Sequence, residues 1–197
     1  SELEDALDFP LDRPYAVVTF HPVTLEENSS ERQFRALLDA CGSCEDMKFI
    51  FTKANADAHG RVINQMIDEF VQARKNAIAV SSLGVKLYLS ALKYSAMVVG
   101  NSSSGIIEAP SFGIPTVNIG DRQRGRVQAS SVINCEPVKE DILRAIRIAM
   151  SEEFRTVARK TVNPYGDGHT SERIVRVLKQ YMLKEKLDLK KRFFDWR

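Results

Sequence analysis

The feature that most constrains the fold is the alternation of short apolar segments with longer segments of helical periodicity. The short segments are rich in β-branched residues and occupy positions 15–20, 48–51, 78–80, 96–99, 116–119 and 132–134. Between them apolar residues recur at helical spacing, for example at Phe34, Leu37 and Cys41. This alternation is typical of parallel strands whose connecting helices cover both faces of the sheet. The sequence therefore predicts an α/β fold with a doubly wound, Rossmann-like parallel sheet.

The first of the long helical segments has recognisable ends. Ser29 or Ser30 can cap it, and Gly42 is expected to close it in the left-handed conformation that glycine adopts easily. Cys41 and Cys44 have the C-x-x-C spacing of redox and zinc sites, but they lie at the end of this helix and not at the start of one. We therefore interpret them as helix-terminus residues with reduced thiols.

Composition excludes several classes of function. The chain has 197 residues, 44% of them hydrophobic, which suits one domain with a sizeable core. Its 28 basic and 26 acidic residues leave a net charge of +2, too small to indicate nucleic-acid binding. No apolar run approaches the ~20 residues of a membrane span and no signal peptide opens the chain, so we expect a cytoplasmic location without a membrane partner. Neither G-x-G-x-x-G nor G-x-x-x-x-G-K-[ST] occurs, so an NAD-type oxidoreductase and a P-loop ATPase are not supported.

The loop after the apolar segment at 96–99 carries the strongest chemical signal. Gly100-Asn101-Ser102-Ser103-Ser104-Gly105 offers hydroxyls and backbone N–H groups before a helix expected to begin near Gly105, an arrangement that can bind phosphate. Glu108 follows about one turn later, where a carboxylate can accept hydrogen bonds from both hydroxyls of a ribose. In the alternative reading, one serine only caps the helix and Glu108 is a solvated acid near the helix dipole. Pro110 lacks an N–H, which predicts a short or irregular helix.

Other polar candidates also follow predicted strands. His21 follows the first strand, Asn55 the second and Arg122 the fifth, so all should lie at the carboxyl edge of the sheet beside the serine loop. The loop Gly120-Asp121-Arg122-Gln123-Arg124-Gly125-Arg126 has the arginine content to bind a diphosphate through paired hydrogen bonds. We interpret Arg124 as a solvated member of this loop.

The whole segment Gly100 to Arg126 closely resembles the signature of the hydrolysing UDP-N-acetylglucosamine 2-epimerases of sialic acid biosynthesis. Further similarity lies in Phe20-His21-Pro22-Val23, Asn55 and Tyr165-Gly166-Asp167-Gly168. In that family two Rossmann-like domains face each other across a cleft, as in the glycosyltransferase-B architecture. This chain resembles the C-terminal domain alone.

The resemblance implies a set of nucleotide contacts in the serine loop. Ser102, Ser103 and the helix start at Gly105 would bind the uridine diphosphate, and Glu108 would bind the ribose. Tyr165 and Asp167 would be structural parts of the cleft wall or hinge.

The remaining implied roles belong to residues of three other loops. His21 would contact the pyrophosphate or assist acid–base chemistry, and is the candidate catalytic residue. Arg122 would engage the nucleotide side of the cleft, whereas Arg126 would shape its loop or reach the substrate. Asn55 is a further candidate for substrate binding. No cofactor and no metal are implied.

Three regions follow from this interpretation. Residues 1–14 are acidic and contain prolines, which suits a connection between domains, and the chain opens at Ser1 without a methionine. Residues 15–183 would form the UDP-binding domain. Residues 184–197 contain Phe193, Phe194 and Trp196, which the family's architecture would bury as a tail helix against the absent N-terminal domain.

The expected function is the UDP-binding half of an enzyme that converts UDP-N-acetylglucosamine and water into N-acetylmannosamine and UDP, inactive without its other half. Its partners would be UDP, a UDP-amino sugar and the N-terminal domain, and the full-length protein would be a homo-oligomer. Three alternatives remain: a hydrolysing 2-epimerase of a UDP-diacetamido-trideoxyhexose, the C-terminal domain of a nucleotide-sugar glycosyltransferase, and a stand-alone nucleotide-binding module.

Overall fold

The computed structural model describes residues 1–22, 29–54 and 58–183. Its centre is a six-stranded parallel sheet with strand order β3-β2-β1-β4-β5-β6. The strands are β1 (Tyr15–Thr19), β2 (Lys48–Thr52), β3 (Ala77–Val80), β4 (Met97–Gly100), β5 (Thr116–Ile119) and β6 (Val132–Cys135). Every neighbouring pair is parallel. The predicted strands and the α/β class are therefore confirmed.

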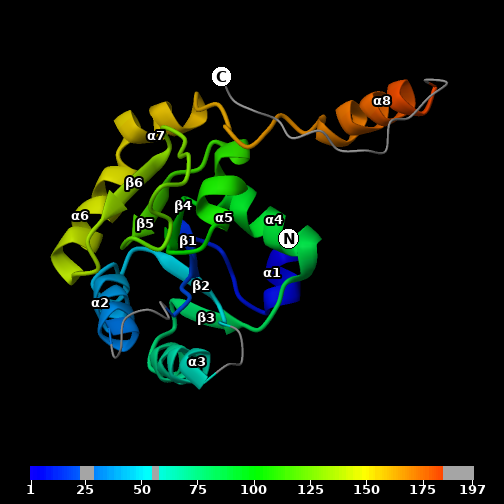
Figure 1. The fold of residues 1–197 in the computed structure, drawn as a ribbon. Coiled ribbons are helices and arrows are strands. Elements are labelled where there is room, and N and C mark those ends of the chain that lie inside the picture. Colours follow the sequence, from blue (N-terminus) through cyan, green and yellow to red (C-terminus); the bar gives the residue numbers. More distant parts are fainter. Residues whose placement is uncertain (23–28, 55–57, 184–197) are drawn as a thin grey trace. The chain divides into compact units, whose positions relative to one another are not determined.

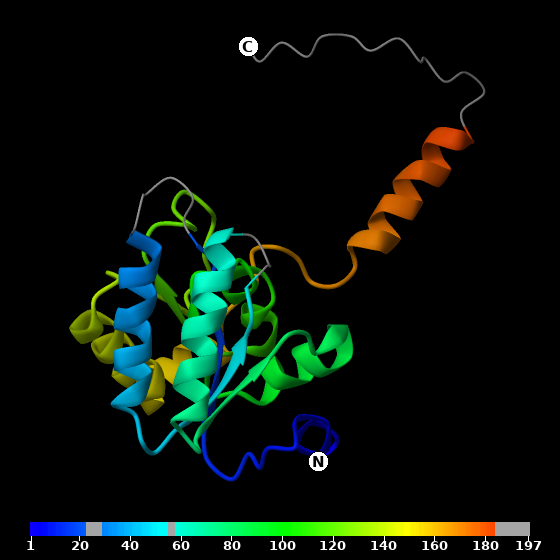
Figure 2. The ribbon, with the colours of Figure 1, turned by 90° about the horizontal axis from the view of Figure 1, so that it is seen from below.

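Helices cover both faces of this sheet, because its central strands are apolar on both sides. On one face, α2 (Ser29–Gly42), α3 (Ala58–Gln72) and α6 (Lys139–Met150) enclose the larger core cluster. On the other face, α1 (Glu2–Leu7), α4 (Gly84–Tyr94) and the 3-10 turn η1 (Ala109–Phe112) pack over a smaller one. Figure 1 shows these two groups on opposite sides of the sheet, and Figure 2 shows α2 and α3 side by side.

The change of face places the topological switch point between β1 and β4. The chain covers one face while it builds β1, β2 and β3, and then returns through α4 on the other face to add β4 beside β1. The loops that leave β1 and β4 therefore begin at the switch point on the carboxyl edge, which is where open sheets of this kind bind ligands.

The two central strands approach closely at Gly100. This residue has φ +134°, and a Cβ atom there would lie 1.9 Å from the main-chain oxygen of Thr19. Only glycine fits both the backbone conformation and the space, so the residue fixes where the serine loop leaves the sheet.

Some local expectations were wrong or incomplete. Gly42 ends α2 but does not have the predicted positive φ; a Cβ there would meet the guanidinium of Arg74 at 2.7 Å. Two helices were not predicted, namely α1 within residues 1–14 and α7 (Glu152–Arg159). Leu3 of α1 is buried in the smaller core cluster. The helix α1 therefore packs against the same face of the sheet as α4.

The segment from Tyr165 onward forms a second compact unit. Its described part contains α8 (Thr170–Met182), with His169 at the N-cap. The carboxylate of Asp167 accepts hydrogen bonds from the His169 N–H, at 3.1 Å, and from Arg173. These contacts order the turn before α8. The tail predicted at 184–197 lies outside the described residues.

Candidate functional site

The serine loop joins β4 to α5 (Ser104–Ile107), which is a single helical turn followed directly by η1. The predicted short, irregular helix is thus confirmed. The N-cap of this turn is Ser103, whose side chain makes no capping hydrogen bond; the hydroxyl of Ser102, one residue earlier, accepts a hydrogen bond from the Ser104 N–H at 3.3 Å. Within the described chain, the N–H groups of Ser102 and Ser103 donate to no protein acceptor. Two adjacent backbone donors at a strand end form a nest that suits an anion.

Asn101 holds the loops around this nest together. Its side chain is buried, with 1% exposure, and exchanges two hydrogen bonds with the backbone of His21: it accepts from the N–H at 2.7 Å and donates to the carbonyl at 2.8 Å. Its own carbonyl accepts from Gln123 at 2.7 Å and from Arg122 at 3.1 Å. One asparagine therefore connects the loops that follow β1, β4 and β5.

The arginine loop, residues 120–126 after β5, is turned toward the nest at its first arginine. The Nη1 atom of Arg122 reaches the carbonyl of Asn101, next to the serines. Burial, and secondly the nearby charge of Arg126, lower the pKa of the Arg122 guanidinium. Among the described residues, no carboxylate forms an ion pair with either arginine. Two neighbouring guanidiniums without a carboxylate partner favour a bound anion.

Glu108 lies between α5 and η1, one turn beyond the nest. Its N–H donates to the carbonyl of Ser104 at 2.9 Å. Its Oε2 atom is buried and has no hydrogen-bond partner in the described part of the chain. A buried carboxylate oxygen without a donor is costly unless a ligand supplies one. The geometry thus favours a binding role for Glu108 over the solvated alternative.

Gly105 contributes through packing. A Cβ atom on it would lie 2.6 Å from Cγ2 of Thr116 on β5, and the Thr116 hydroxyl donates to the Gly105 carbonyl at 2.7 Å. Glycine therefore lets the single turn of α5 sit directly on the sheet, which positions the nest.

Tyr88 and Ser104 were not among the predicted site residues. Tyr88 on α4 donates a hydrogen bond to the Ser104 hydroxyl at 2.6 Å. It also lines a groove of 380 Å³ with Thr19, Thr52 and Leu83. An apolar helical position such as Tyr88 carries no sequence signal that separates a site residue from a core residue.

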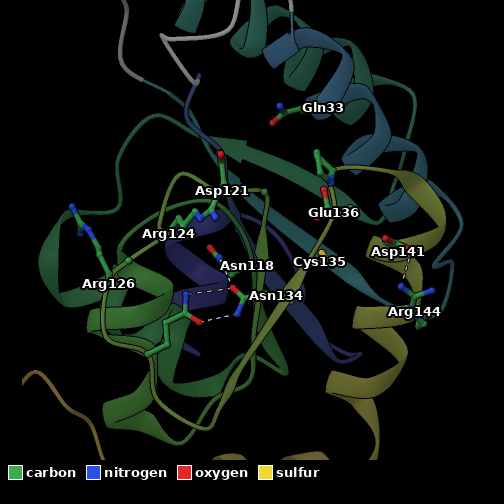
Figure 3. A pocket seen from close by; sticks show the side chains of 14 residues that line it. Gln33, Asn118, Asp121, Arg124, Arg126, Asn134, Cys135, Glu136, Asp141 and Arg144 are labelled. Carbon is green, nitrogen blue, oxygen red and sulfur yellow. Dashed lines mark hydrogen bonds and ion pairs between the residues drawn. The ribbon is translucent and has the colours of Figure 1, made fainter.

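A larger hollow of 880 Å³ opens over the ends of β5 and β6 (Figure 3). Asn118 and Asn134 lie side by side in it and are joined by a hydrogen bond of 2.8 Å. Arg124 and Arg126 line it, together with the ion pair between Asp141 and Arg144. The serines and Arg122 are outside this hollow, so the arginine loop separates it from the nest.

The structure thus brings most of the predicted site residues to one edge of the sheet. His21, Ser102 and Arg122 are linked through Asn101, with Ser103, Gly105 and Glu108 on the same turn. Asn55 lies outside the described residues. The integrating residue, Asn101, was missed because an asparagine after a strand reads as an ordinary loop residue; its burial is visible only in the fold.

Two of the free cysteines belong to the end of α2: Cys41 lies in the helix and Cys44 follows it. Burial raises the pKa of the Cys41 and Cys44 thiols, which disfavours reactive thiolates. Among residues 1–22, 29–54 and 58–183, no group of three or more His, Cys, Asp or Glu side chains could hold a metal ion. Over the same residues, no helix is both long enough and apolar enough to cross a membrane.

Comparison with known proteins gives consistent matches. The family model described as UDP-N-acetylglucosamine 2-epimerase matches residues 2–179. The GDP/UDP-N,N'-diacetylbacillosamine 2-epimerase (hydrolyzing) of Campylobacter jejuni is 37% identical over 78% of this chain and 40% of its own length. The polysialic acid biosynthesis protein P7 of Escherichia coli is 38% identical over 92% of this chain and 46% of its own length.

A solved structure supports the fold. The S. aureus MnaA-UDP co-structure matches with a TM-score of 0.71 and 22% identity, over 92% of this chain and 49% of that chain. The present chain spans about half the length of that protein and less than half of the two curated relatives.

Proposed function

Since the chain belongs to the UDP-N-acetylglucosamine 2-epimerase family, we propose that it is the UDP-binding part of a hydrolysing UDP-sugar 2-epimerase. The observation that carries the proposal is the nest: the backbone donors of Ser102 and Ser103 lack a protein acceptor and lie beside the Arg122 guanidinium. In this proposal the diphosphate oxygens accept from these donors. Arg126 adds positive charge behind Arg122.

If the diphosphate binds at the nest, the ribose and the uracil base can be placed as well. Glu108 accepts from the ribose hydroxyls, which supplies the donors that its buried Oε2 atom lacks. The charge of Glu108 acts on Tyr88, so the carboxylate lies near the 380 Å³ groove. That groove is lined largely by apolar and hydroxyl-bearing side chains, which suits the flat face of uracil.

The proposed reaction converts UDP-N-acetylglucosamine and water into N-acetylmannosamine and UDP. A proton leaves C2 while the C1–O bond to UDP breaks; water then adds to the resulting glycal and gives the inverted C2 centre. No hydride is transferred, so no nicotinamide is needed. The chain's contribution is to stabilise the negative charge that grows on the β-phosphate as UDP departs, through preorganised N–H groups and guanidiniums.

His21 is the candidate for assisting this departure. Its backbone is fixed by Asn101, which places the residue at the same edge as the nest. The carboxylates that handle the C2 proton would belong to the part of the full-length protein outside this chain. We therefore expect the chain by itself to bind UDP but not to turn over a UDP-sugar.

A UDP-diacetamido-trideoxyhexose is a second candidate substrate. It is favoured by the 37% identity to the C. jejuni protein, whose name specifies diacetylbacillosamine. Incubating the full-length protein with each UDP-sugar and water, without an acceptor, separates the two. It also tests the glycosyltransferase alternative, which predicts no free amino sugar.

Calorimetric titration of this chain with UDP tests the binding proposal. Wild-type protein should bind UDP, and Glu108→Gln should bind it about 10–100-fold more weakly, since two hydrogen bonds to a charged acceptor are weakened. Binding of inorganic pyrophosphate should be equal for both proteins. Folded wild-type protein that gives no binding heat with UDP would refute the proposal, and equal losses for both ligands would assign Glu108 to folding.

A further inference from the structure

A series of hydrogen-bonded hydroxyl groups extends from the serine loop along the carboxyl edge of the sheet. The Tyr88 hydroxyl donates to the Ser104 hydroxyl at 2.6 Å, although the two residues lie on α4 and α5, on either side of β4 in the sequence. Thr19, at the end of β1, also hydrogen-bonds to Tyr88, and its hydroxyl lies 2.6 Å from that of Thr52 on β2. The ends of two strands and one helix thereby support a single serine.

The direction of the hydrogen bond decides what Ser104 can do. Because the Ser104 oxygen accepts from Tyr88, its own proton must point elsewhere. Within the described chain, the Ser104 hydroxyl has no second partner. The nearby Glu108 Oε2 atom has none either, so the Ser104 proton is not used there. Ser104 is left with an oriented donor and no acceptor, at the loop where a diphosphate is proposed to bind.

Tyr88 is suited to hold this orientation. Burial raises the pKa of its phenol; the hydrogen bond with Ser104 offsets part of this rise and the charge of Glu108 adds to it, so the group is a neutral O–H donor at physiological pH. Its ring is half-buried in the wall of the groove, which restricts its motion. A tyrosine hydroxyl in this position fixes the serine rotor before the ligand arrives, which reduces the entropy cost of binding.

We propose that Tyr88 is a positioning residue and Ser104 a further phosphate-binding residue: the Tyr88 hydroxyl holds the Ser104 hydroxyl so that its proton is presented to a diphosphate oxygen. This inference rests on the proposed UDP-binding function and adds to it. The ligand chemistry is that of a diphosphate, with or without a nucleoside. The contribution is therefore distinct from that of Glu108, which reads the ribose.

The test is calorimetric titration of the chain with UDP and, separately, with inorganic pyrophosphate. Tyr88→Phe keeps the ring and should weaken both ligands by the same factor, about fivefold, the usual effect of one neutral hydrogen bond. Ser104→Ala should do at least as much. The matched control is Tyr94→Phe on the same helix, whose side chain is 67% exposed and which should bind both ligands like wild type.

The double variant separates positioning from a general structural effect. If Tyr88 acts through Ser104, Tyr88→Phe combined with Ser104→Ala should bind no more weakly than Ser104→Ala alone. The inference would be overturned if the affinity losses of the two single variants multiplied in the double variant. It would also be overturned if either single variant bound pyrophosphate as tightly as wild type. If Tyr88→Phe does not fold, Ser104→Ala alone tests the inference: UDP and pyrophosphate binding equal to wild type in that variant would refute it. Failure of wild-type protein to bind UDP would instead refute the proposed function, and this inference with it.

Discussion

Replacing Asn101 by alanine tests whether one buried side chain organises the site. The substitution removes the acceptor of the His21 N–H, at 2.7 Å, and the donor to the His21 carbonyl, at 2.8 Å. The hydrogen bonds from Arg122 and Gln123 go to the main-chain carbonyl of residue 101 and remain possible in the variant. The loop after β1 should therefore detach, while the contact between the loops after β4 and β5 persists.

The magnitude follows from the two lost hydrogen bonds. Each contributes about 1 kcal/mol, and the part-buried setting of both bonds adds a desolvation penalty, for a total of about 2–4 kcal/mol. That is a large share of the roughly 5–15 kcal/mol by which domains of this kind are stable. Urea denaturation of the chain, followed by circular dichroism, measures the change. A loss below about 1 kcal/mol would show that the His21 loop does not depend on Asn101.

Asn101→Asp sharpens the test through pH. A protonated aspartic acid can both accept from the His21 N–H and donate to its carbonyl, as asparagine does, whereas a carboxylate cannot donate. Burial and the facing carbonyl would raise the pKa of this carboxyl above its unfolded value of about 4. The stability of the variant should hence approach that of wild type below about pH 4 and fall as pH rises through the raised pKa. A pH-independent deficit would contradict the hydrogen-bond assignment.

Three further predictions concern other parts of the domain. Gly105→Ala should cost about 1–3 kcal/mol of stability in urea titrations, because the new Cβ would lie 2.6 Å from Thr116 Cγ2. Adding Thr116→Ser removes that methyl group and should restore most of the lost stability. If the double variant were not rescued, this contact would not be the cause. In the full-length protein, Arg122→Ala should lower kcat and kcat/KM together by about 100-fold, whereas Arg124→Ala should be near wild type, and the reverse order would contradict the placement of Arg122. The Leu11 N–H and then the N-terminal amine lower the pKa of Glu4 to about 2, so the stability it contributes is present above about pH 4.5 and lost as pH falls toward 2. Unfolding titrations across that range should show a slope that Glu4→Gln reduces, and an unchanged slope would exclude this contribution.

The fold class was determined by local sequence. Parallel strands buried on both faces must be apolar throughout, and the helices that cover them must be amphipathic, so the pattern was readable at Tyr15–Thr19 and at each strand after it. The glycines and serines after β4 likewise predicted an anion-binding loop, because only a few residue types suit such a loop. Short α1 and α7 escaped detection, since helices of 6 and 8 residues carry little periodic signal.

Tertiary structure alone decided how the site is held together. Asn101 contacts His21 across 80 positions of sequence, and Tyr88 contacts Ser104 only because α4 packs against η1, which follows α5. It also distinguished the serines: Ser103 is the N-cap, the Ser102 hydroxyl accepts from the Ser104 N–H, and the Ser104 hydroxyl accepts from Tyr88. The physical reason is that hydrogen bonds between loops depend on where strands end in space, and adjacency at the edge of a sheet follows strand order and not chain order.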